Sequence, residues 1–381
     1  MRLLFVIKSV ALPGGGTERV LADLAARLAR RGHALTVASF DSPDDPPFYT
    51  LDPAVQRRAL PIGNVRQGTR PGEALRRALA LRRLLREVRP DVAAGFMHSA
   101  YIPLGLAALG TGVPIIASEH IAYQHYRTRR LEAVLLRISP RISRVITAVS
   151  PAIRDGFPRR IRDRMVVVPN PVAVDGSRTA DVLGEGRGVK TLLAVGRLEA
   201  QKDHKTLIAA FARIAAEFPD WRLRVVGEGS LRSELEAQVE RLGVSGRVEL
   251  PGPTAEVAEE YVAAQLFAMP SSYESFGLTT AEALSYGLPV VGFADCPGTN
   301  ELVQDGVNGL LAGGDPREEA LAQALARLMA SPELRARMGA AGLASSETFA
   351  PEKVAAIWEG LIRRVACSGR APEAVRPQHS K

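Results

Sequence analysis

Short apolar segments alternate with longer amphipathic ones along almost the whole chain, and this alternation constrains the fold more than any other feature. In the first half, the segments typical of buried strands are LLFVI, ALTVASF, DVAAGFM, IIASEH, VITAVS and VVVPN. The stretches with helical periodicity cover residues 17–31, 72–89 and 102–109. Strands that alternate with helices at this spacing predict a parallel α/β sheet.

A second series with the same pattern begins near residue 190. Its strands are expected at TLLAVGR, RLRVVG, VEL, LFAMP and PVVGF, with helices over residues 205–217 and 230–242. A chain of 381 residues is also too long for one typical core. We therefore predict an α/β protein with two Rossmann-like domains that face each other across a cleft, with ligands at the carboxyl ends of the strands.

The domain limits follow from composition. Residues 172–188 carry Gly and polar side chains and are typical of a linker, so we expect a first domain over 1–172 and a second over 173–351. A last helix is expected over residues 352–366. The polar, Pro-bearing segment 367–381 is expected to be a disordered tail.

Charge is unevenly distributed along the sequence. Residues 1–172 hold 27 Arg/Lys and 13 Asp/Glu, a net of +14, whereas the remainder holds 22 and 28, a net of −6. A basic first half suits an anionic partner, and nucleic acid and an anionic membrane both qualify on charge. The sequence has no zinc finger and no RNA-binding aromatic signature, which disfavours nucleic acid. The Arg-rich stretches 70–89 and 127–144 either form solvated faces or contact an anionic bilayer or lipid diphosphate.

Location is also constrained by the sequence. It has no run of 18 or more apolar residues, and its first segment resembles a buried strand rather than a signal peptide. The two cysteines, Cys296 and Cys367, suggest neither a disulfide framework nor a metal site. We expect a cytoplasmic protein, either free or bound peripherally to the inner face of the membrane.

Residues 270–291, PSSYESFGLTTAEALSYGLPVV, are the most informative about function. Glu274 and Glu282 flank a glycine-bearing loop that leads into a helix expected from Thr279 to about Ser285. Free amides and the positive end of a helix dipole favour an anion there. Carboxylates beside it suit the hydroxyls of ribose and sugar. The segment therefore suits a nucleotide-sugar diphosphate, although Thr279-x-x-Glu282 also fits a capping box.

A second motif, Gly196-Arg197, follows the first strand of the second series, and Lys202 comes five residues later. Two cations at a strand end can hold a diphosphate and stabilise the charge that develops when it leaves. The alternative is that both are solvated surface side chains.

Other candidates lie at strand ends in both halves. Gly14-Gly15-Gly16-Thr17-Glu18 follows the first strand without forming a G-x-G-x-x-G fingerprint. His120 ends IIASEH, and Glu119 beside it is either an acid–base group or a residue that orients the site. Gly227-Glu228-Gly229 ends RLRVVG and either cradles a nucleotide or only makes a turn.

The combination of E-x7-E, EALSYGLPVV and G-R-x-x-x-x-K resembles the donor signature of retaining GT-B glycosyltransferases, in the large bacterial family 4, group 1. The resemblance covers nearly the whole chain and implies that the last helix crosses back to the first domain. It implies that Glu282 holds the ribose, Glu274 and His120 the sugar, and Arg197 and Lys202 the diphosphate, with no metal or other cofactor. The catalytic residues are then His120, Glu274, Arg197 and Lys202. The donor-binding residues are Gly15, Gly16, Gly227, Glu228, Phe276, Gly277, Leu278, Thr279 and Glu282.

The expected activity is transfer of a hexosyl or N-acetylhexosaminyl unit from a nucleotide-diphosphate sugar, with a UDP-sugar favoured. The expected acceptor is lipid-linked or a polysaccharide, and the anomeric configuration is retained. Two alternatives remain: a GT-B-fold sugar-nucleotide epimerase, and a non-catalytic protein that binds glycans or membranes. No nucleic-acid partner is expected.

Overall fold

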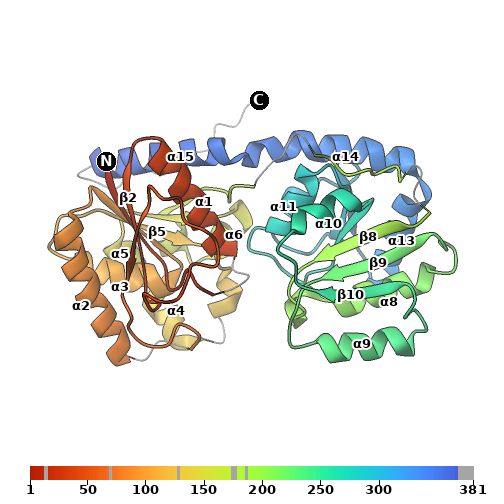
Figure 1. Ribbon diagram of the computed structural model, residues 1–381, viewed down its shortest axis with the longest axis horizontal. Coiled ribbons are helices and arrows are strands. Elements are labelled where there is room, and N and C mark those ends of the chain that lie inside the picture. The colour runs from red at the N-terminus through yellow and green to blue at the C-terminus, as the bar shows by residue number, and fades with distance from the viewer. Residues whose placement is uncertain (13–15, 68–70, 127–128, 173–177, 185–187, 368–381) are drawn as a thin grey trace. The chain divides into compact units, whose positions relative to one another are not determined.

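The protein is described by a computed structural model that covers residues 1–12, 16–67, 71–126, 129–172, 178–184 and 188–367. The chain forms two compact units, and each is described by itself (Figure 1). One unit contains residues 1–171 together with the segment from Pro351 onward. The other contains Val172–Ala350.

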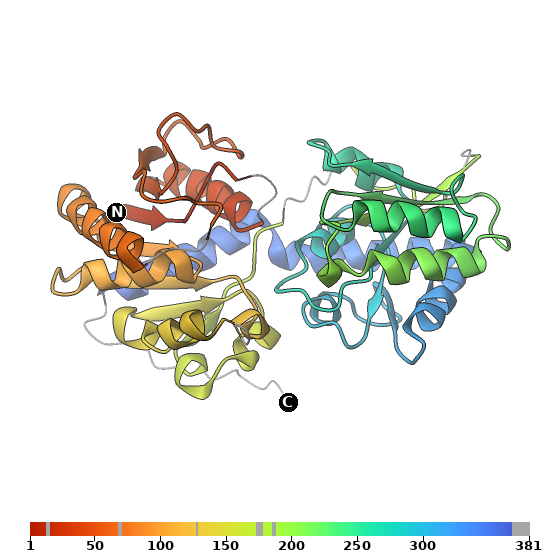
Figure 2. The ribbon, with the colours of Figure 1, turned by 90° about the horizontal axis from the view of Figure 1, so that it is seen from below.

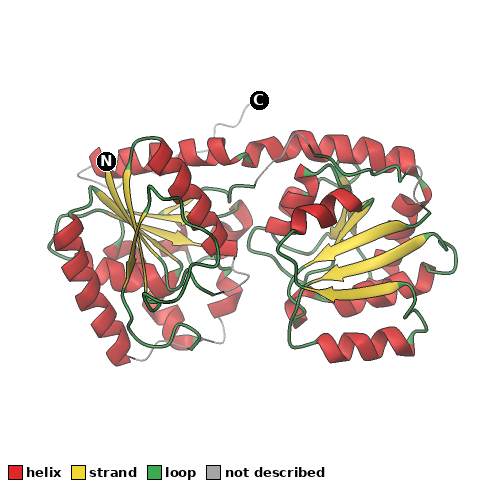
Figure 3. Ribbon diagram, in the orientation of Figure 1, coloured by secondary structure: helices red, strands yellow, loops and turns green. Residues whose placement is uncertain are grey.

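The first unit is built on a parallel sheet, and strands are yellow in Figure 3. The strand order is β3-β2-β1-β4-β5-β6-β7. Its strands are β1 Arg2–Val6, β2 Ala34–Ser39, β3 Gln56–Ala59, β4 Val92–Phe96, β5 Ile115–Glu119, β6 Val145–Ala148 and β7 Met165–Val167. The order reverses direction between β1 and β4, which is the topological switch point of a Rossmann-like sheet. Each of β4, β5 and β6 is buried along its whole length, which explains their largely apolar sequences.

Helices cover both faces of this sheet. They are α1 Gly16–Arg30, α2 Pro71–Val88, α3 His98–Ala108, the 3-10 turn η1 Tyr123–Tyr126, α4 Arg130–Leu136, α5 Ser139–Ile142, α6 Pro151–Gly156, α7 Arg159–Arg162 and α15 Pro351–Cys367. The last of these, α15, lies beside α1 and shares one core with β1 and β4. Trp358 of α15 stacks on Phe96 of β4 with ring centroids 5.8 Å apart, so the end of the chain completes the first unit's core.

The second unit contains a parallel sheet with the order β10-β9-β8-β11-β12-β13. Its strands are β8 Lys190–Val195, β9 Trp221–Val226, β10 Val248–Gly252, β11 Leu266–Met269, β12 Val290–Phe293 and β13 Gly309–Ala312. Its helices are η2 Ala200–Lys202, α8 His204–Ile214, α9 Arg232–Arg241, α10 Val257–Ala263, α11 Leu278–Ser285, α12 Thr299–Leu302, α13 Arg317–Ala330, α14 Pro332–Ser346 and η3 Glu347–Phe349.

One core fills the space between this sheet and helices α8, α9 and α13. Figure 2 shows α8 and α9 running side by side across one face of the sheet. Because β8 lies between β9 and β11, the loops that follow these three strands meet at one edge. The predicted donor-binding residues of the second half belong to these loops and to the start of α11.

Two strands were not expected from the sequence. The first, β3, has the sequence QRRA, and this edge strand has no fully buried residue. The second, β13, is a four-residue edge strand inside a glycine-rich segment. Among the described residues no helix is long and apolar enough to cross a membrane.

Candidate active site

The centre of the candidate site is an ion pair between Lys202 and Glu274. Lys202 ends η2, in the loop that follows β8, and Glu274 lies in the loop that follows β11. Lys202 Nζ lies 2.6 Å from Glu274 Oε1, and only 13% and 10% of the two side chains are exposed. The Ser271 hydroxyl donates to the same oxygen at 2.6 Å. Two predicted residues far apart in sequence are therefore in direct contact, held by neighbouring strands.

Backbone contacts fix the loops that carry this pair. Gln201 donates from its side chain to the Tyr273 carbonyl at 2.8 Å. The Glu274 amide donates to the Pro297 carbonyl in the loop after β12 at 2.9 Å. A Cβ on Gly298, whose φ is +82°, would lie 2.5 Å from the Glu274 carbonyl oxygen. This close approach admits only glycine at position 298.

The loop after β11 ends at the start of α11. Gly277 is the N-cap residue, with a φ of +81° and no side-chain capping bond. Phe276 is buried and packs edge-on against Phe349, with centroids 5.3 Å apart. The first amides of a helix, here those of Leu278 and Thr279, have no partner inside the helix. The helix start therefore offers backbone donors and a positive dipole to an anion.

Glu282 lies one turn further along α11 and is buried. The Tyr261 hydroxyl of α10 donates to Glu282 Oε2 at 2.8 Å. The capping-box alternative is wrong, because the N-cap is Gly277 and Thr279 is already the second residue of the helix. The Glu282 side chain is instead oriented by a buried tyrosine, which no sequence motif indicated.

The loops after β8 and β9 cross in close contact. A Cβ on Gly227 would lie 1.9 Å from the Gly196 carbonyl oxygen, and the Leu198 amide donates to the Glu228 carbonyl at 2.9 Å. Glu228 points its exposed side chain toward Arg232, with Oε2 2.7 Å from a guanidinium nitrogen. Its hydrogen bonds with Arg232 and the Gly229 amide lower the pKa of the Glu228 carboxyl.

Arg197 stands beside these glycines with an exposed side chain. His204, the first residue of α8, is a neighbour that the sequence reasoning missed. It is buried, and burial, followed by the nearby charge of Lys202, lowers the pKa of its imidazole to about 4. His204 is therefore neutral at pH 7, and both of its ring nitrogens are buried without a hydrogen-bond partner among the described residues. The motif QKDH could have indicated this position, since Asp203 is a helix-capping residue and places His204 at the first position of α8.

In the first unit, His120 follows directly after β5. Its ring stacks on Phe96, with centroids 5.8 Å apart, and its Nε2 lies 2.9 Å from the Ser118 hydroxyl. Thr147 donates to that hydroxyl at 3.0 Å. The other ring nitrogen, Nδ1, is buried without a hydrogen-bond partner in the described part of the chain. Burial lowers the pKa of the imidazole to about 4.

The remaining predicted residues are placed as follows. Gly15 lies outside the described residues, and Gly16 is the exposed first residue of α1. Glu119 is wholly buried, so its carboxyl does not face solvent. In the described parts of the chain, no cluster of three or more His, Cys, Asp or Glu is arranged to hold a metal ion.

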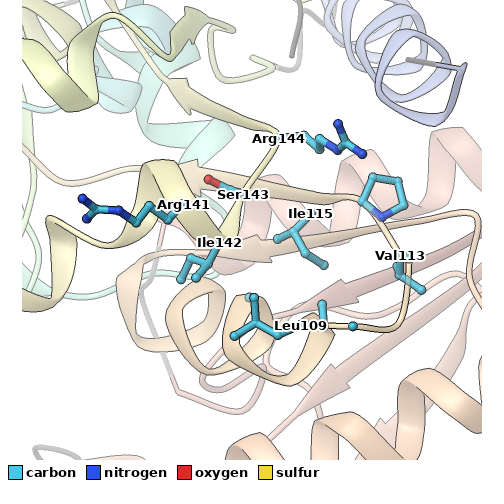
Figure 4. Close-up of a pocket in the computed structure, with 12 residues that line it drawn as sticks. Leu109, Val113, Ile115, Arg141, Ile142, Ser143 and Arg144 are labelled. Carbon is cyan, nitrogen blue, oxygen red and sulfur yellow. The ribbon is translucent and has the colours of Figure 1, made fainter. Parts of the chain in front are cut away.

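A cavity of about 210 Å³ lies elsewhere in the first unit (Figure 4). It is lined by Leu109 at the end of α3, by Val113 and Ile115 where β5 begins, and by Ile142 and Arg144 near the start of β6. The cavity lies at the amino ends of β5 and β6, whereas His120 follows the carboxyl end of β5. The cavity is therefore not part of the candidate site.

Comparisons with known proteins agree with this arrangement. The family model for glycosyl transferases group 1 matches residues 178–344, and the model for glycosyltransferase family 4 matches residues 14–175. A D-inositol 3-phosphate glycosyltransferase of Thermobifida fusca is 30% identical over 86% of this chain and 84% of its own length. An α-1,4-N-acetyl-D-galactosaminyltransferase of Campylobacter jejuni, whose name specifies a diphospho-undecaprenol substrate, is 25% identical over 96% of this chain and 99% of its own length.

Solved structures show the same fold. Anabaena Alr3699/HepE in complex with UDP aligns with a TM-score of 0.76 at 22% identity, covering 95% of this chain and 99% of that one. The lipopolysaccharide outer core galactosyltransferase WaaB, in its apo form, aligns with a TM-score of 0.74 at 20% identity, covering 95% and 99%.

Proposed function

The chain belongs to glycosyltransferase family 4, group 1, with the GT-B fold, and we propose that it transfers a hexosyl or N-acetylhexosaminyl unit from a UDP-sugar to a lipid-linked or polysaccharide hydroxyl with retention of configuration. One observation carries the proposal: the contact between Lys202 and Glu274 beside the open start of α11. It combines a cation, a carboxylate and free backbone amides within one pair of loops.

Transition-state stabilisation is the proposed task of the cations. Cleavage of the glycosidic bond leaves negative charge on the departing nucleoside diphosphate. Arg197, Lys202 and the first amides of α11 supply positive potential where that charge develops. These groups take the role that a divalent metal plays elsewhere, so we propose a reaction that requires no metal. Glu282, held by Tyr261, accepts hydrogen bonds from the ribose hydroxyls.

Sugar recognition is the proposed task of Glu274 and His120. Glu274 has two oxygens, and Lys202 and Ser271 both contact Oε1, which leaves Oε2 to accept from a sugar hydroxyl. His120 is neutral at pH 7, so it offers the sugar a hydrogen bond from an uncharged imidazole rather than a full positive charge. We propose departure and attack on the same face of the sugar, since no carboxylate is assigned as a nucleophile.

The choice of UDP and of the acceptor rests on relatives. Alr3699/HepE was solved with UDP, and the Campylobacter jejuni relative is named for a diphospho-undecaprenol substrate. A further relative, 25% identical over 95% of this chain, is an amylovoran biosynthesis glycosyltransferase of Erwinia amylovora. The first observation supports a uridine nucleotide for this chain, and the other two support an acceptor that belongs to polysaccharide or lipid-linked glycan assembly.

An anionic membrane is the proposed partner of helix α2. Leu75 and Leu79 are 63% and 53% exposed there, and Arg83 and Arg86 continue the same helical face, with Arg76 beside it. Leucines among arginines on an exposed helix face are typical of helices that lie in a membrane surface. Each arginine near an anionic bilayer contributes about 1 kcal/mol.

Vesicle sedimentation tests this partner. We expect binding to phosphatidylglycerol vesicles, weaker binding to phosphatidylcholine vesicles, and loss of the first when Leu75 and Leu79 are both replaced by Gln. Leu242→Gln, at a leucine of the second unit that is 43% exposed, is the matched control and leaves binding intact. Equal binding of the wild type to both vesicles would contradict the proposal.

The activity is tested by nucleotide release and sugar transfer with UDP-, GDP- and ADP-sugars, in EDTA, with and without membrane lipid extract. We expect release from one donor, stimulated by lipid, and a product with the donor's anomeric configuration by NMR. Lys202→Ala removes this activity. Lys205→Ala, at a surface lysine paired with Glu234, is the matched control and retains it.

The alternatives give different results in the same assay. An epimerase converts the nucleotide sugar into its isomer with no acceptor present. A non-catalytic protein binds nucleotide without release. Wild-type turnover in the Lys202→Ala variant would also contradict the assignment.

A further inference from the structure

Glu119, the last residue of β5, is a fully buried carboxylate surrounded by hydrogen-bond donors. The Tyr101 hydroxyl of α3 donates to Oε2 at 2.7 Å, and the Tyr126 hydroxyl of η1 lies 3.2 Å from both oxygens. The amides of His120 and Ile121 donate to Oε1 at 3.0 Å each. Four donors from three segments of the first unit therefore converge on one buried acid.

The two amides belong to the turn that leaves β5 and carries the His120 ring. Hydrogen bonds to an ionised acceptor are about twice as strong as neutral ones. The conformation of the turn therefore depends on whether the Glu119 carboxyl is charged. Burial raises the pKa of this carboxyl to about 7, in spite of its four donors, so both charge states are accessible near neutral pH.

The polar groups around Glu119 accommodate either state. Tyr126 also contacts His98, with its hydroxyl 2.9 Å from Nδ1, and His98 Nε2 lies 3.4 Å from Glu132 Oε2 on α4. The hydroxyl of Tyr126 has one proton, which it donates either to Glu119 or to His98. The other ionisable groups close to His98 are Lys8, His125 and Arg129.

Each state has a consistent set of proton positions between Glu119 and His98. With Glu119 ionised, Tyr126 donates to it, and His98 donates from Nδ1 to the Tyr126 oxygen. With one proton added, Glu119 donates to the Tyr126 oxygen and Tyr126 donates to His98 Nδ1, so the proton of His98 moves to Nε2, which lies 3.4 Å from Glu132 Oε2. The second arrangement holds one proton more than the first.

We propose that Glu119 is the positioning residue for His120: its carboxylate fixes the turn that carries the imidazole, and protonation of the carboxylate weakens the two amide hydrogen bonds that hold that turn. The inference rests on the proposed function only where His120 acts on the donor sugar. Activity then declines as the pH falls below about 7. The titration of His120 itself does not explain such a decline, because the pKa of its imidazole is about 4.

Amide hydrogen exchange tests the positioning without any need for activity. In the full chain at pH 8, we expect the amides of residues 120 and 121 to exchange at least about tenfold faster in Glu119→Gln than in the wild type, because a charged acceptor is lost. Wild-type protection, corrected for intrinsic rates, should decline below pH 7. Glu132→Gln changes the acid at the far end of the network and is the matched control. At pH 8 its amides at residues 120 and 121 should be as well protected as in the wild type.

The pH profile of sugar transfer tests the consequence. The wild type should lose activity below pH 7. Glu119→Gln should show a flat profile and a kcat about 10- to 100-fold lower, since a displacement of about 1 Å at a reacting group costs that much. The donor KM should change little, because the groups proposed to hold the diphosphate belong to the second unit. Glu119→Asp keeps the charge and should restore the pH dependence.

The outcomes separate the two proposals. Faster exchange in Glu119→Gln with no transfer by the wild type would support the positioning and overturn the proposed function. If exchange, kcat and pH profile in Glu119→Gln match those of the wild type, the positioning role of Glu119 is overturned and the proposed function is unaffected. If Glu119→Gln does not fold, Tyr126→Phe decides. The Tyr126 hydroxyl lowers the pKa of Glu119, so its loss should raise that pKa and move the decline in activity to higher pH. An unmoved profile overturns the inference.

Discussion

The pair between Lys202 and Glu274 allows a quantitative prediction for the protein without ligand. The perturbation is a double-mutant cycle of Lys202→Met, Glu274→Gln and the combined variant. Removal of one partner from a buried pair costs about 3–5 kcal/mol, since the other charge is left uncompensated. The two side chains keep a tenth of their surface exposed, and Ser271 still donates to Glu274, so the expected cost of each single change is about 2–3 kcal/mol.

The combined variant leaves no unpaired charge and should cost only about 1–2 kcal/mol. The coupling energy, which is the difference between the two single changes together and the combined variant, should then be about 3 kcal/mol. The equivalent cycle at Lys205 and Glu234, which form an exposed pair on α8 and α9, should give a coupling of only about 0.2–1 kcal/mol.

Tryptophan fluorescence can follow the second unit alone. The chain has two tryptophans, and they belong to different units: Trp221 in β9 and Trp358 in α15. In a Trp358→Phe background, urea unfolding monitored at Trp221 reports the unit that contains the pair. A coupling energy below 0.5 kcal/mol would refute the reasoning, because it would mean that the two charges are not paired in solution.

Three further predictions concern other parts of the protein. The pKa values of three buried histidines fall from 6.5 to about 4, and that of one buried carboxyl rises from 4.5 to about 7. Between pH 5 and 6 the unfolded chain then binds about two protons more than the folded one, so the free energy of unfolding should rise by roughly 2 kcal/mol per pH unit. This stability is therefore gained as the pH rises from 5 to 6 and decreases as the pH falls toward 4. Equal free energies of urea unfolding at pH 5 and pH 6 would contradict this. Gly227→Ala places a Cβ 1.9 Å from the Gly196 carbonyl oxygen and should destabilise by about 3 kcal/mol, whereas Gly246→Ala, which meets open space, should be nearly neutral in the same unfolding assay. Tyr261→Phe removes the donor to Glu282 and should cost about 1 kcal/mol and raise the donor KM, and an unchanged KM in steady-state kinetics would argue against a ribose role for Glu282.

The sequence predicted the fold class and the family, and both are confirmed. Strands that are buried on both faces have continuous apolar sequences, so segments such as VAAGF are recognisable without any partner. The two strands that escaped prediction, β3 and β13, both lie at sheet edges. The first, QRRA, has no fully buried residue and so carries little apolar signal. The second, GLLA, is apolar and largely buried but only four residues long.

The candidate site was predictable only in part. The motifs identified Lys202 and Glu274 one by one, but their contact depends on β8 and β11 being neighbours in the sheet. The groups that orient the motif residues have no local signature. Tyr261 is 21 residues from Glu282, and Tyr101 is 18 residues from Glu119. A hydroxyl that finds a distant carboxylate is a property of the fold, and one sequence does not reveal it.

Three glycines of these loops explain how such a site is kept in register. Gly227 and Gly229 each bring the loop after β9 against a carbonyl of the loop after β8, and Gly298 brings the loop after β12 against the Glu274 carbonyl. At each point one backbone touches another with no side chain between them. A side chain can rotate to relieve a contact, but a backbone carbonyl held by a sheet cannot do so at low cost. The positions of Arg197, Lys202 and Glu274 are therefore set by the sheet itself, which is the preorganisation that electrostatic catalysis requires. By this argument a substitution at any of the three glycines should impair donor turnover even where the charged residues are untouched.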